Sequence, residues 1–186
     1  MKQNRTPDSA DKPAEPDEVL TLLHTAAHED KTEVIPFLLD HGYGVDVVSK
    51  LGFTPLHSAA MQNHHQAARL LLEYGAKPNL RNNLGGTPLL YAALKDHLET
   101  AKVLLKHGAL VDVPDKNGAT ALQIAAECGS CKMARLLLAH GANARSKDNS
   151  GKTPLDVASA EVAIILRHHL DRHAKPKTRL PPAVNN

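Results

Sequence analysis

The side chains with the greatest chemical reactivity are two thiols, Cys128 and Cys131, in the segment CGSC. Cysteines separated by two residues have the spacing of zinc ligands and of thiol–disulfide centres. A structural zinc ion needs four ligands, and a thioredoxin-like centre needs a strand–helix–strand setting that this segment lacks. Even if His97 came close, the fourth ligand would be missing. We therefore expect no metal site, and keep a metal- or redox-modulated binding protein as an alternative function.

The twelve histidines follow a regular pattern rather than the spacing of a metal site. His41, His107 and His140 each precede a glycine, where a cation would complement the end of a helix. The sequence shows no nucleophile paired with a base at motif spacing and no phosphate-binding glycine loop. Paired carboxylates outside the regular pattern are also missing. We expect a protein that is not an enzyme and needs no cofactor.

Charge and composition narrow the class of partner. The 186 residues are 42% hydrophobic, and 22 Lys and Arg oppose 20 Asp and Glu, for a formal net charge of +2. Such a balance provides little field to attract nucleic acid or an anionic membrane. No apolar run approaches the roughly 18 residues of a membrane span, and residues 1–18 lack the apolar stretch of a secretory signal. We expect a cytoplasmic or nuclear monomer that binds proteins.

An internal repeat sets the elements that carry these side chains. A threonine opens a similar segment every 33 residues, at Thr21, Thr54, Thr87, Thr120 and Thr153. A series of glycines has the same spacing, at Gly42, Gly75, Gly108 and Gly141. So has a series of alanine pairs, at residues 26–27, 59–60, 92–93 and 125–126. Three series in register predict five copies of one structural unit.

Each recurring residue type has a physical role in that unit. Threonine is a good N-cap and proline suits the first helical turn, so TPL predicts the start of a helix. The leucine and alanines that follow form one narrow, small-residue face. A second apolar run ends at the recurring glycine, which suits the left-handed residue after a helix. Asn117–Gly118 and Ser150–Gly151 favour tight reversals. The unit is helix, turn, helix and projecting loop.

Two short helices cannot bury their own apolar faces, so the copies must stack into a solenoid. The segment GFTPLHSAAMQNHHQAARLLLEYGAKPN resembles an ankyrin repeat, and about residues 16–172 resemble the ankyrin repeat family. The resemblance implies an all-α repeat solenoid, an ankyrin-type stack of helix–turn–helix units with projecting β-hairpin-like loops. It also implies that His24 and His57 bridge backbone and threonine hydroxyl groups between repeats. The expected repeats cover about 16–48, 49–81, 82–114, 115–147 and 148–172.

The outer repeats depart from the pattern. The first has Leu22 in place of the first-turn proline and Pro36 inside its second helix, as a capping repeat would. The fifth lacks about three residues between its helices, and we expect it to close the stack. Residues 1–15 and 173–186 are Pro-rich and polar, and we expect disordered tails. The C-terminal tail is basic and is either solvated, docked by a partner or a weak localisation signal.

The family generally binds proteins in a concave groove formed by loop tips and first helices. The exposed, variable positions of that groove correspond here to Lys50, Leu51, Phe53, Met61, Gln62, Asn83, Leu84, Leu94, Lys95, Lys116, Asn117 and Glu127. We expect a binding patch around Phe53, Met61, Leu84 and Leu94, because aromatic and Met residues are favoured in interfaces. Alternatively, Leu51 and Leu84 only pack against adjacent loops.

These observations predict a non-catalytic protein–protein interaction module acting as an adaptor, scaffold or inhibitor. Besides the metal- or redox-modulated alternative, a bacterial effector acting on host proteins would have the same sequence features. Tyr91 lies inside a first helix, and we expect it to be a packing residue rather than a contact.

Overall fold

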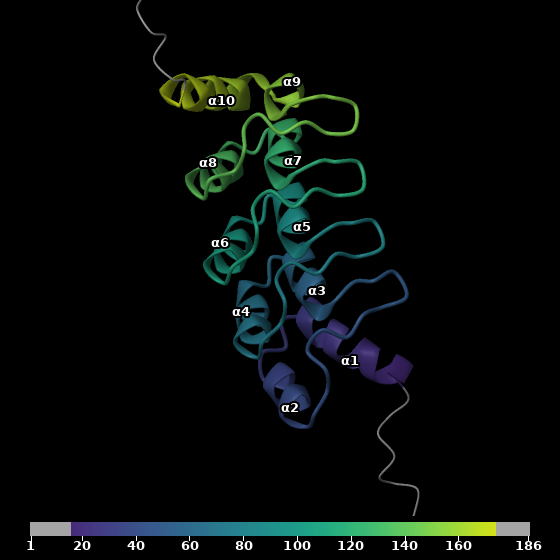
Figure 1. The fold of residues 1–186 in the computed structure, drawn as a ribbon. Coiled ribbons are helices and arrows are strands. Elements are labelled where there is room, and N and C mark those ends of the chain that lie inside the picture. Colours follow the sequence, from purple (N-terminus) through teal and green to yellow (C-terminus); the bar gives the residue numbers. More distant parts are fainter. Residues whose placement is uncertain (1–15, 174–186) are drawn as a thin grey trace, which may run out of the picture.

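The computed structural model describes residues 16–173, and within this range the chain is all-helical, without strands (Figure 1). The helices are α1 (Pro16–His28), α2 (Val34–Asp40), α3 (Pro55–Met61), α4 (His65–Glu73), α5 (Pro88–Leu94), α6 (Leu98–Lys106), α7 (Ala121–Glu127), α8 (Cys131–Ala139), α9 (Pro154–Val157) and α10 (Ala160–Arg172). The expected tails are 1–15 and 173–186, and except for His173, which follows α10, they lie outside the described residues.

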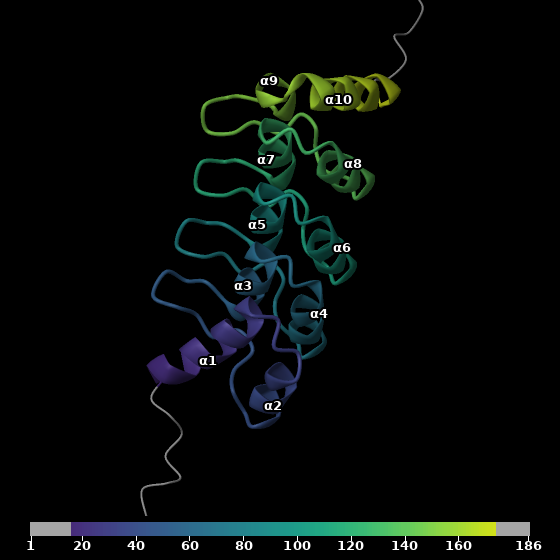
Figure 2. The ribbon, with the colours of Figure 1, turned by 180° about the vertical axis from the view of Figure 1, so that it is seen from behind.

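The helices form two columns. From α3 onward the odd-numbered helices stack in an inner column, and the even-numbered helices form an outer column beside it (Figure 1). The loops that lead from each outer helix to the next inner helix all project on the side away from the outer column, and Figure 2 shows the same arrangement from behind. The predicted stack of helix–turn–helix units with projecting loops is confirmed.

Threonine caps start the inner helices. Thr54, Thr87 and Thr120 have extended backbones, and each hydroxyl accepts a hydrogen bond from the amide three residues later. A proline fills the first position of α3, α5 and α9, and it also disfavours helical geometry in the threonine before it. The sequence pattern thus predicted these starts correctly.

The first repeat is different. Helix α1 begins at Pro16, so Thr21 lies inside the helix and the predicted start at this threonine is wrong. Leu22 stands where the second, third and fifth repeats have proline, so no following proline restricts Thr21. The missing proline does not explain the longer helix by itself, because Thr120 caps α7 although Ala121 follows it. Pro16 occupies the first helical position, which its fixed φ favours.

The fifth repeat closes the stack with altered helix lengths. Helix α9 has four residues, whereas α3, α5 and α7 have seven each. Ala158 ends α9 in an extended conformation, and the hydroxyl of Ser159 caps α10. The missing residues have therefore removed the last turn of the inner helix. Helix α10 has 13 residues against nine in α8 and extends past the stack.

The buried core follows the repeating pattern. All four alanine pairs are buried, with at most 4% of any of these residues exposed. Their small side chains let neighbouring inner helices approach closely. The leucines two residues after the capping threonines are also almost completely buried: Leu56, Leu89 and Leu122. The apolar face predicted for the first helices is the face that stacks.

The outer helices end as predicted. Gly42, Gly75, Gly108 and Gly141 have φ between +83° and +86°, just past the helix ends. In three of these ends the preceding histidine donates from Nδ1 to the carbonyl four residues earlier, at 2.7 Å for His41 and 2.9 Å for His107 and His140. These histidines complete the helix C-termini, in agreement with their position in the sequence.

Candidate functional site

The projecting loops are tight turns closed by hydrogen bonds. In the second loop the Asn82 amide donates to the Gly86 carbonyl at 3.0 Å. Its side-chain Oδ1 accepts from the amides of Leu84 and Gly86, both at 2.9 Å. Asp115 and Asp148 occupy the same position and make the same contacts in the next two loops. The loops are hairpin-like in shape, and their tips are held rigidly by these local bonds.

Adjacent tips are also bonded to each other. A tip amide donates to a tip carbonyl of the preceding loop in three pairs: Asn83 to Leu51 at 3.0 Å, Lys116 to Leu84 at 3.3 Å, and Asn149 to Asn117 at 2.9 Å. The Asn83 side chain adds a bond from Nδ2 to the Lys50 carbonyl at 3.1 Å, and Asn149 repeats it in a later loop. The tips form one continuous ridge, in which the Asn83 side chain holds two loops together.

Three predicted contact residues present apolar side chains to solvent on this ridge and beside it. Leu51 and Leu84 are each 65% exposed at consecutive tips, and Leu94 is 47% exposed at the end of α5. Most of each tip leucine is therefore accessible, although the loops are bonded through their backbones. The polar residues predicted for this surface are exposed as well: Lys50, Gln62, Asn83, Lys95, Lys116, Asn117 and Glu127. We define the ridge and these residues as the loop-tip surface.

Phe53 and Met61 differ from the other predicted contacts because both are half-buried. The Phe53 ring lies 5.6 Å from that of His57 and 5.3 Å from that of Tyr91, measured between centroids. The Tyr91 hydroxyl accepts a hydrogen bond from Asn82 Nδ2 at 2.6 Å. Tyr91 is thus a packing residue, as predicted. Phe53 is partly accessible to solvent, and its ring also packs against His57 and Tyr91.

His57 links two repeats beneath this surface. Its Nδ1 accepts from the Thr54 amide at 3.1 Å, and its Nε2 donates to the Gly86 carbonyl at 3.0 Å. Burial lowers the pKa of His57 to about 4, although the Gly86 bond acts in the opposite direction. His24 makes the equivalent contact to the Phe53 carbonyl at 2.8 Å. His57 bridges the Thr54 hydroxyl and the backbone of the next repeat, as the resemblance implied, and His24 makes the bond to the backbone of the next repeat.

Gln123 performs the same function one junction further along and was not predicted. Its Oε1 accepts from the Thr120 amide at 3.2 Å, and its Nε2 donates to the Lys152 carbonyl at 2.8 Å. The signal was available, because Gln123 lies 66 residues after His57 in the same register. In the third repeat this position holds Leu90, which is buried and has no side-chain hydrogen bond to offer.

Cys128 follows the last residue of α7, and Cys131 is the first residue of α8. Cys128 is exposed, Cys131 is half-buried, and both are free thiols. Burial, with Glu127 and Asp96 as weaker contributors, raises the pKa of the Cys128 thiol. His97 directs Nδ1 to the Ala60 carbonyl at 3.0 Å. Among residues 16–173 no three His, Cys, Asp or Glu are grouped to hold a metal ion. These contacts do not favour the metal or redox alternative.

The two helix columns and the ridge of bonded loop tips define a helical repeat protein of the solenoid class. A family model described as ankyrin repeats (3 copies) matches the chain in overlapping segments, at residues 7–82, 23–115, 77–148 and 110–175. The chain belongs to the ankyrin repeat family. A search among curated proteins finds no match. None of the helices in the described part of the chain is long and apolar enough to cross a membrane.

Proposed function

We propose that this protein is a non-catalytic interaction module that captures partner proteins on the loop-tip surface. Ankyrin repeats are generally protein–protein interaction modules, which sets the class of function. The specific role that we propose is that of a cytoplasmic monomer acting as an adaptor, scaffold or inhibitor. An adaptor or scaffold would hold two partners at once, whereas an inhibitor would occupy one.

The observation that carries the proposal is the exposure of Leu51, Leu84 and Leu94 on a rigid support. Apolar side chains that remain accessible in a cluster are a common sign of a binding surface. The tips that carry Leu51 and Leu84 are fixed by backbone hydrogen bonds, and Leu94 belongs to a helix, so a partner would order few further residues on binding. Charged and amide side chains surround the leucines, as in the polar rim of protein interfaces.

The buried polar side chains support a structural rather than a catalytic use. Four buried polar side chains make structural hydrogen bonds: Thr54, His57, Asn82 and Gln123. These bonds stabilise a helix start, a loop turn or a junction between repeats. Buried polar groups at an active site would instead face a space for substrate. Their contacts here explain why these residues recur in the pattern.

The test compares two variants that remove the same kind of side chain from different places. The first is Leu51→Ser, Leu84→Ser and Leu94→Ser; the control is Leu110→Ser and Ile164→Ser, whose leucine and isoleucine are 61% and 66% exposed outside the loop-tip surface. Both variants should stay folded, as judged by circular dichroism. Proteins captured from native lysate are quantified by mass spectrometry. The proposal requires that a captured protein be lost with the first variant and retained with the control.

Equal capture by both variants would exclude the loop-tip surface as the binding site. If a partner is found, the mass of the purified complex by light scattering distinguishes the specific roles. One bound partner is expected for an inhibitor, and two simultaneous partners for an adaptor or scaffold. The free protein should elute with the mass of a monomer.

A further inference from the structure

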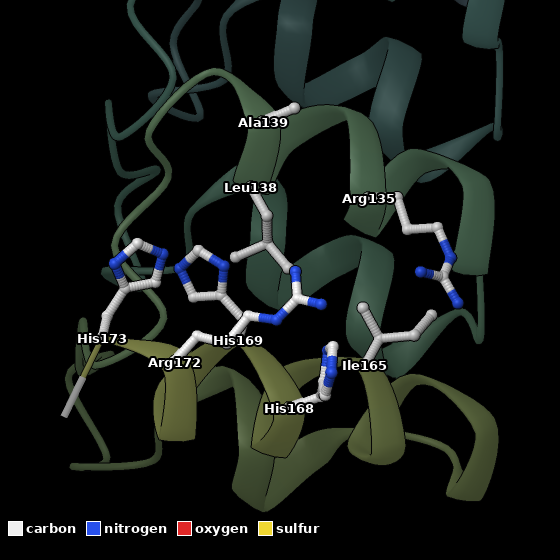
Figure 3. A pocket seen from close by; sticks show the side chains of 8 residues that line it. All are labelled: Arg135, Leu138, Ala139, Ile165, His168, His169, Arg172 and His173. Carbon is white, nitrogen blue, oxygen red and sulfur yellow. The ribbon is translucent and has the colours of Figure 1, made fainter.

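A pocket of about 350 Å³ lies between α8 and α10, in the outer column and away from the loop tips (Figure 3). Arg135 and Leu138 come from α8, whereas α10 and the residue after it contribute cationic or titratable side chains. Those side chains are His168, His169, Arg172 and His173. Figure 3 shows His168, His169 and Arg172 on one helix, and Arg135 and Leu138 on the other. None of the residues that line the pocket is acidic.

In the described part of the chain, Arg135 lacks the acidic partner that the equivalent residues of two earlier repeats have. Arg69 on α4 lies 4.0 Å from Glu73, and Lys102 on α6 lies 2.8 Å from Glu99. Arg135 is the next residue in this series, 33 positions after Lys102. Within residues 16–173, no carboxylate lies within 4.0 Å of Arg135 or Arg172. Of Arg69, Lys102 and Arg135, only Arg135, which lines the pocket, has no acidic partner among the described residues.

His169 lies close to other titratable and positive groups. The rings of His169 and His173 lie 4.5 Å apart between centroids. The pKa of His169 is lowered, first by burial and then by the nearby His173 and Arg145. An anion in the pocket would reverse the last two effects, because it would favour the charged imidazole. The positive groups around the pocket therefore favour an anionic ligand.

We propose that this pocket binds a phosphomonoester on a partner protein, a phosphoserine or phosphothreonine side chain. Arginine presents donors in a fork that matches phosphate oxygens, and imidazole N–H groups add further donors. Arg135 from α8 and Arg172 from α10 line the same pocket, and Leu138 adds an apolar side chain to its wall. The site is separate from the loop-tip surface, so it adds a second, modification-dependent contact.

Other occupants fit this chemistry less well. A metal ion would face two arginines, and the histidines do not form a metal-binding group among the described residues. The chain's own C-terminal segment carries Lys175, Lys177 and Arg179 and no acid, so it would repel the pocket rather than fill it. Nucleic acid prefers an extended basic track along its backbone, whereas these groups converge on one pocket.

The experiment measures phosphopeptide binding to the full chain by NMR. The probe is a short neutral peptide, acetyl-Gly-Ala-phosphoSer-Ala-Gly-amide, and the observed signals are the ring protons of His169 and His173. We expect saturable shifts with the phosphopeptide and none with the unphosphorylated peptide. Arg135→Ala with Arg172→Ala should weaken binding by about tenfold or more, because charge-assisted phosphate contacts are lost. Arg69→Ala is the matched control on α4 and should bind as the wild type does.

A lysine variant and two competing ligands test the site further. Arg135→Lys with Arg172→Lys keeps the charge without the fork and should bind with intermediate affinity. Equal affinity for the wild type and the double alanine variant would overturn the site. Inorganic phosphate binding as tightly as the peptide would overturn the protein-borne source in favour of free phosphate. A single-stranded RNA oligonucleotide that displaces the phosphopeptide and binds more tightly would overturn the choice of partner.

Discussion

The Nε2 atom of His57 lies 3.0 Å from the carbonyl oxygen of Gly86, 29 residues further along the chain. The imidazole is completely buried, and its Nδ1 accepts a bond from the Thr54 amide, so the bound ring is neutral. One side chain thus caps a helix in the second repeat and holds the turn of the third. A protonated ring could not accept at Nδ1, and this makes the junction sensitive to acid.

The first prediction concerns this acid sensitivity. The folded pKa of His57, about 4, lies below the ordinary 6.5. Between these values the unfolded chain binds a proton that the folded chain does not, so stability falls as the pH drops. The contribution of His57 should be complete at neutral pH, and about 2 kcal/mol of unfolding free energy should be lost by pH 5. Urea unfolding between pH 7 and pH 4 measures it.

The control for this prediction is His57→Gln, since Gln123 makes the same two bonds at a later junction. Glutamine does not titrate, so all other acid effects remain while that of residue 57 disappears. The stability difference between wild type and variant should therefore shrink or reverse towards pH 4. Parallel pH profiles for the two proteins would show that His57 is not the group responsible.

The second prediction concerns the contact between loop tips. A Cβ atom on Gly118 would lie 2.7 Å from Asn149 Oδ1 and 2.9 Å from the Asn149 amide nitrogen. At Gly151, in the last loop, the same atom would meet nothing within 4 Å. Their φ angles, +80° and +81°, are nearly equal, so alanine causes about the same backbone strain at both positions. Gly118→Ala should therefore be less stable than Gly151→Ala by about 1–2 kcal/mol.

Thermal and urea unfolding of the two alanine variants give this difference directly. Equal losses of stability would mean that the tips separate easily to accept a methyl group. In that case the ridge would not be the rigid support on which the proposed function relies.

The third prediction concerns the reactivity of Cys128. Burial and the neighbouring Glu127 and Asp96 raise the pKa of this thiol, so less thiolate is present at neutral pH. With Cys131→Ser as background, iodoacetamide should modify Cys128 more slowly in the folded protein than in urea. Faster modification in the folded state would contradict the pKa direction and would revive the redox alternative.

The repeat pattern predicted most of the fold because each recurring residue has a local physical role. Threonine and proline determine the start of α3 and α5, and glycine determines the end of α4 and α6. The pattern was misleading at Thr21, which lies inside α1. Thr120 caps α7 although Ala121 follows it, so proline assists the helix start but is not required for it.

The surfaces were harder to predict because they depend on contacts between repeats. The sequence indicates that Phe53 lies near a loop tip, but not that its ring packs against Tyr91 from the next repeat. It does not indicate that Arg135 and Arg172 line one pocket, because Arg172 comes from the longer final helix. The length of that helix follows from the closing repeat, which departs from the repeating pattern.

The last prediction distinguishes Phe53, which stabilises the fold, from Leu84, which is free to contact a partner. Phe53 is half-buried between His57 and Tyr91, so Phe53→Ser should cost about 2 kcal/mol, roughly half the loss at a fully buried phenylalanine. Leu84 is 65% exposed, so Leu84→Ser should change stability by no more than about 0.5 kcal/mol. Urea unfolding midpoints with unchanged slopes provide both values. If Leu84→Ser is as destabilising as Phe53→Ser, then Leu84 holds the tips together, and an apolar residue free to contact a partner must be sought at Leu94.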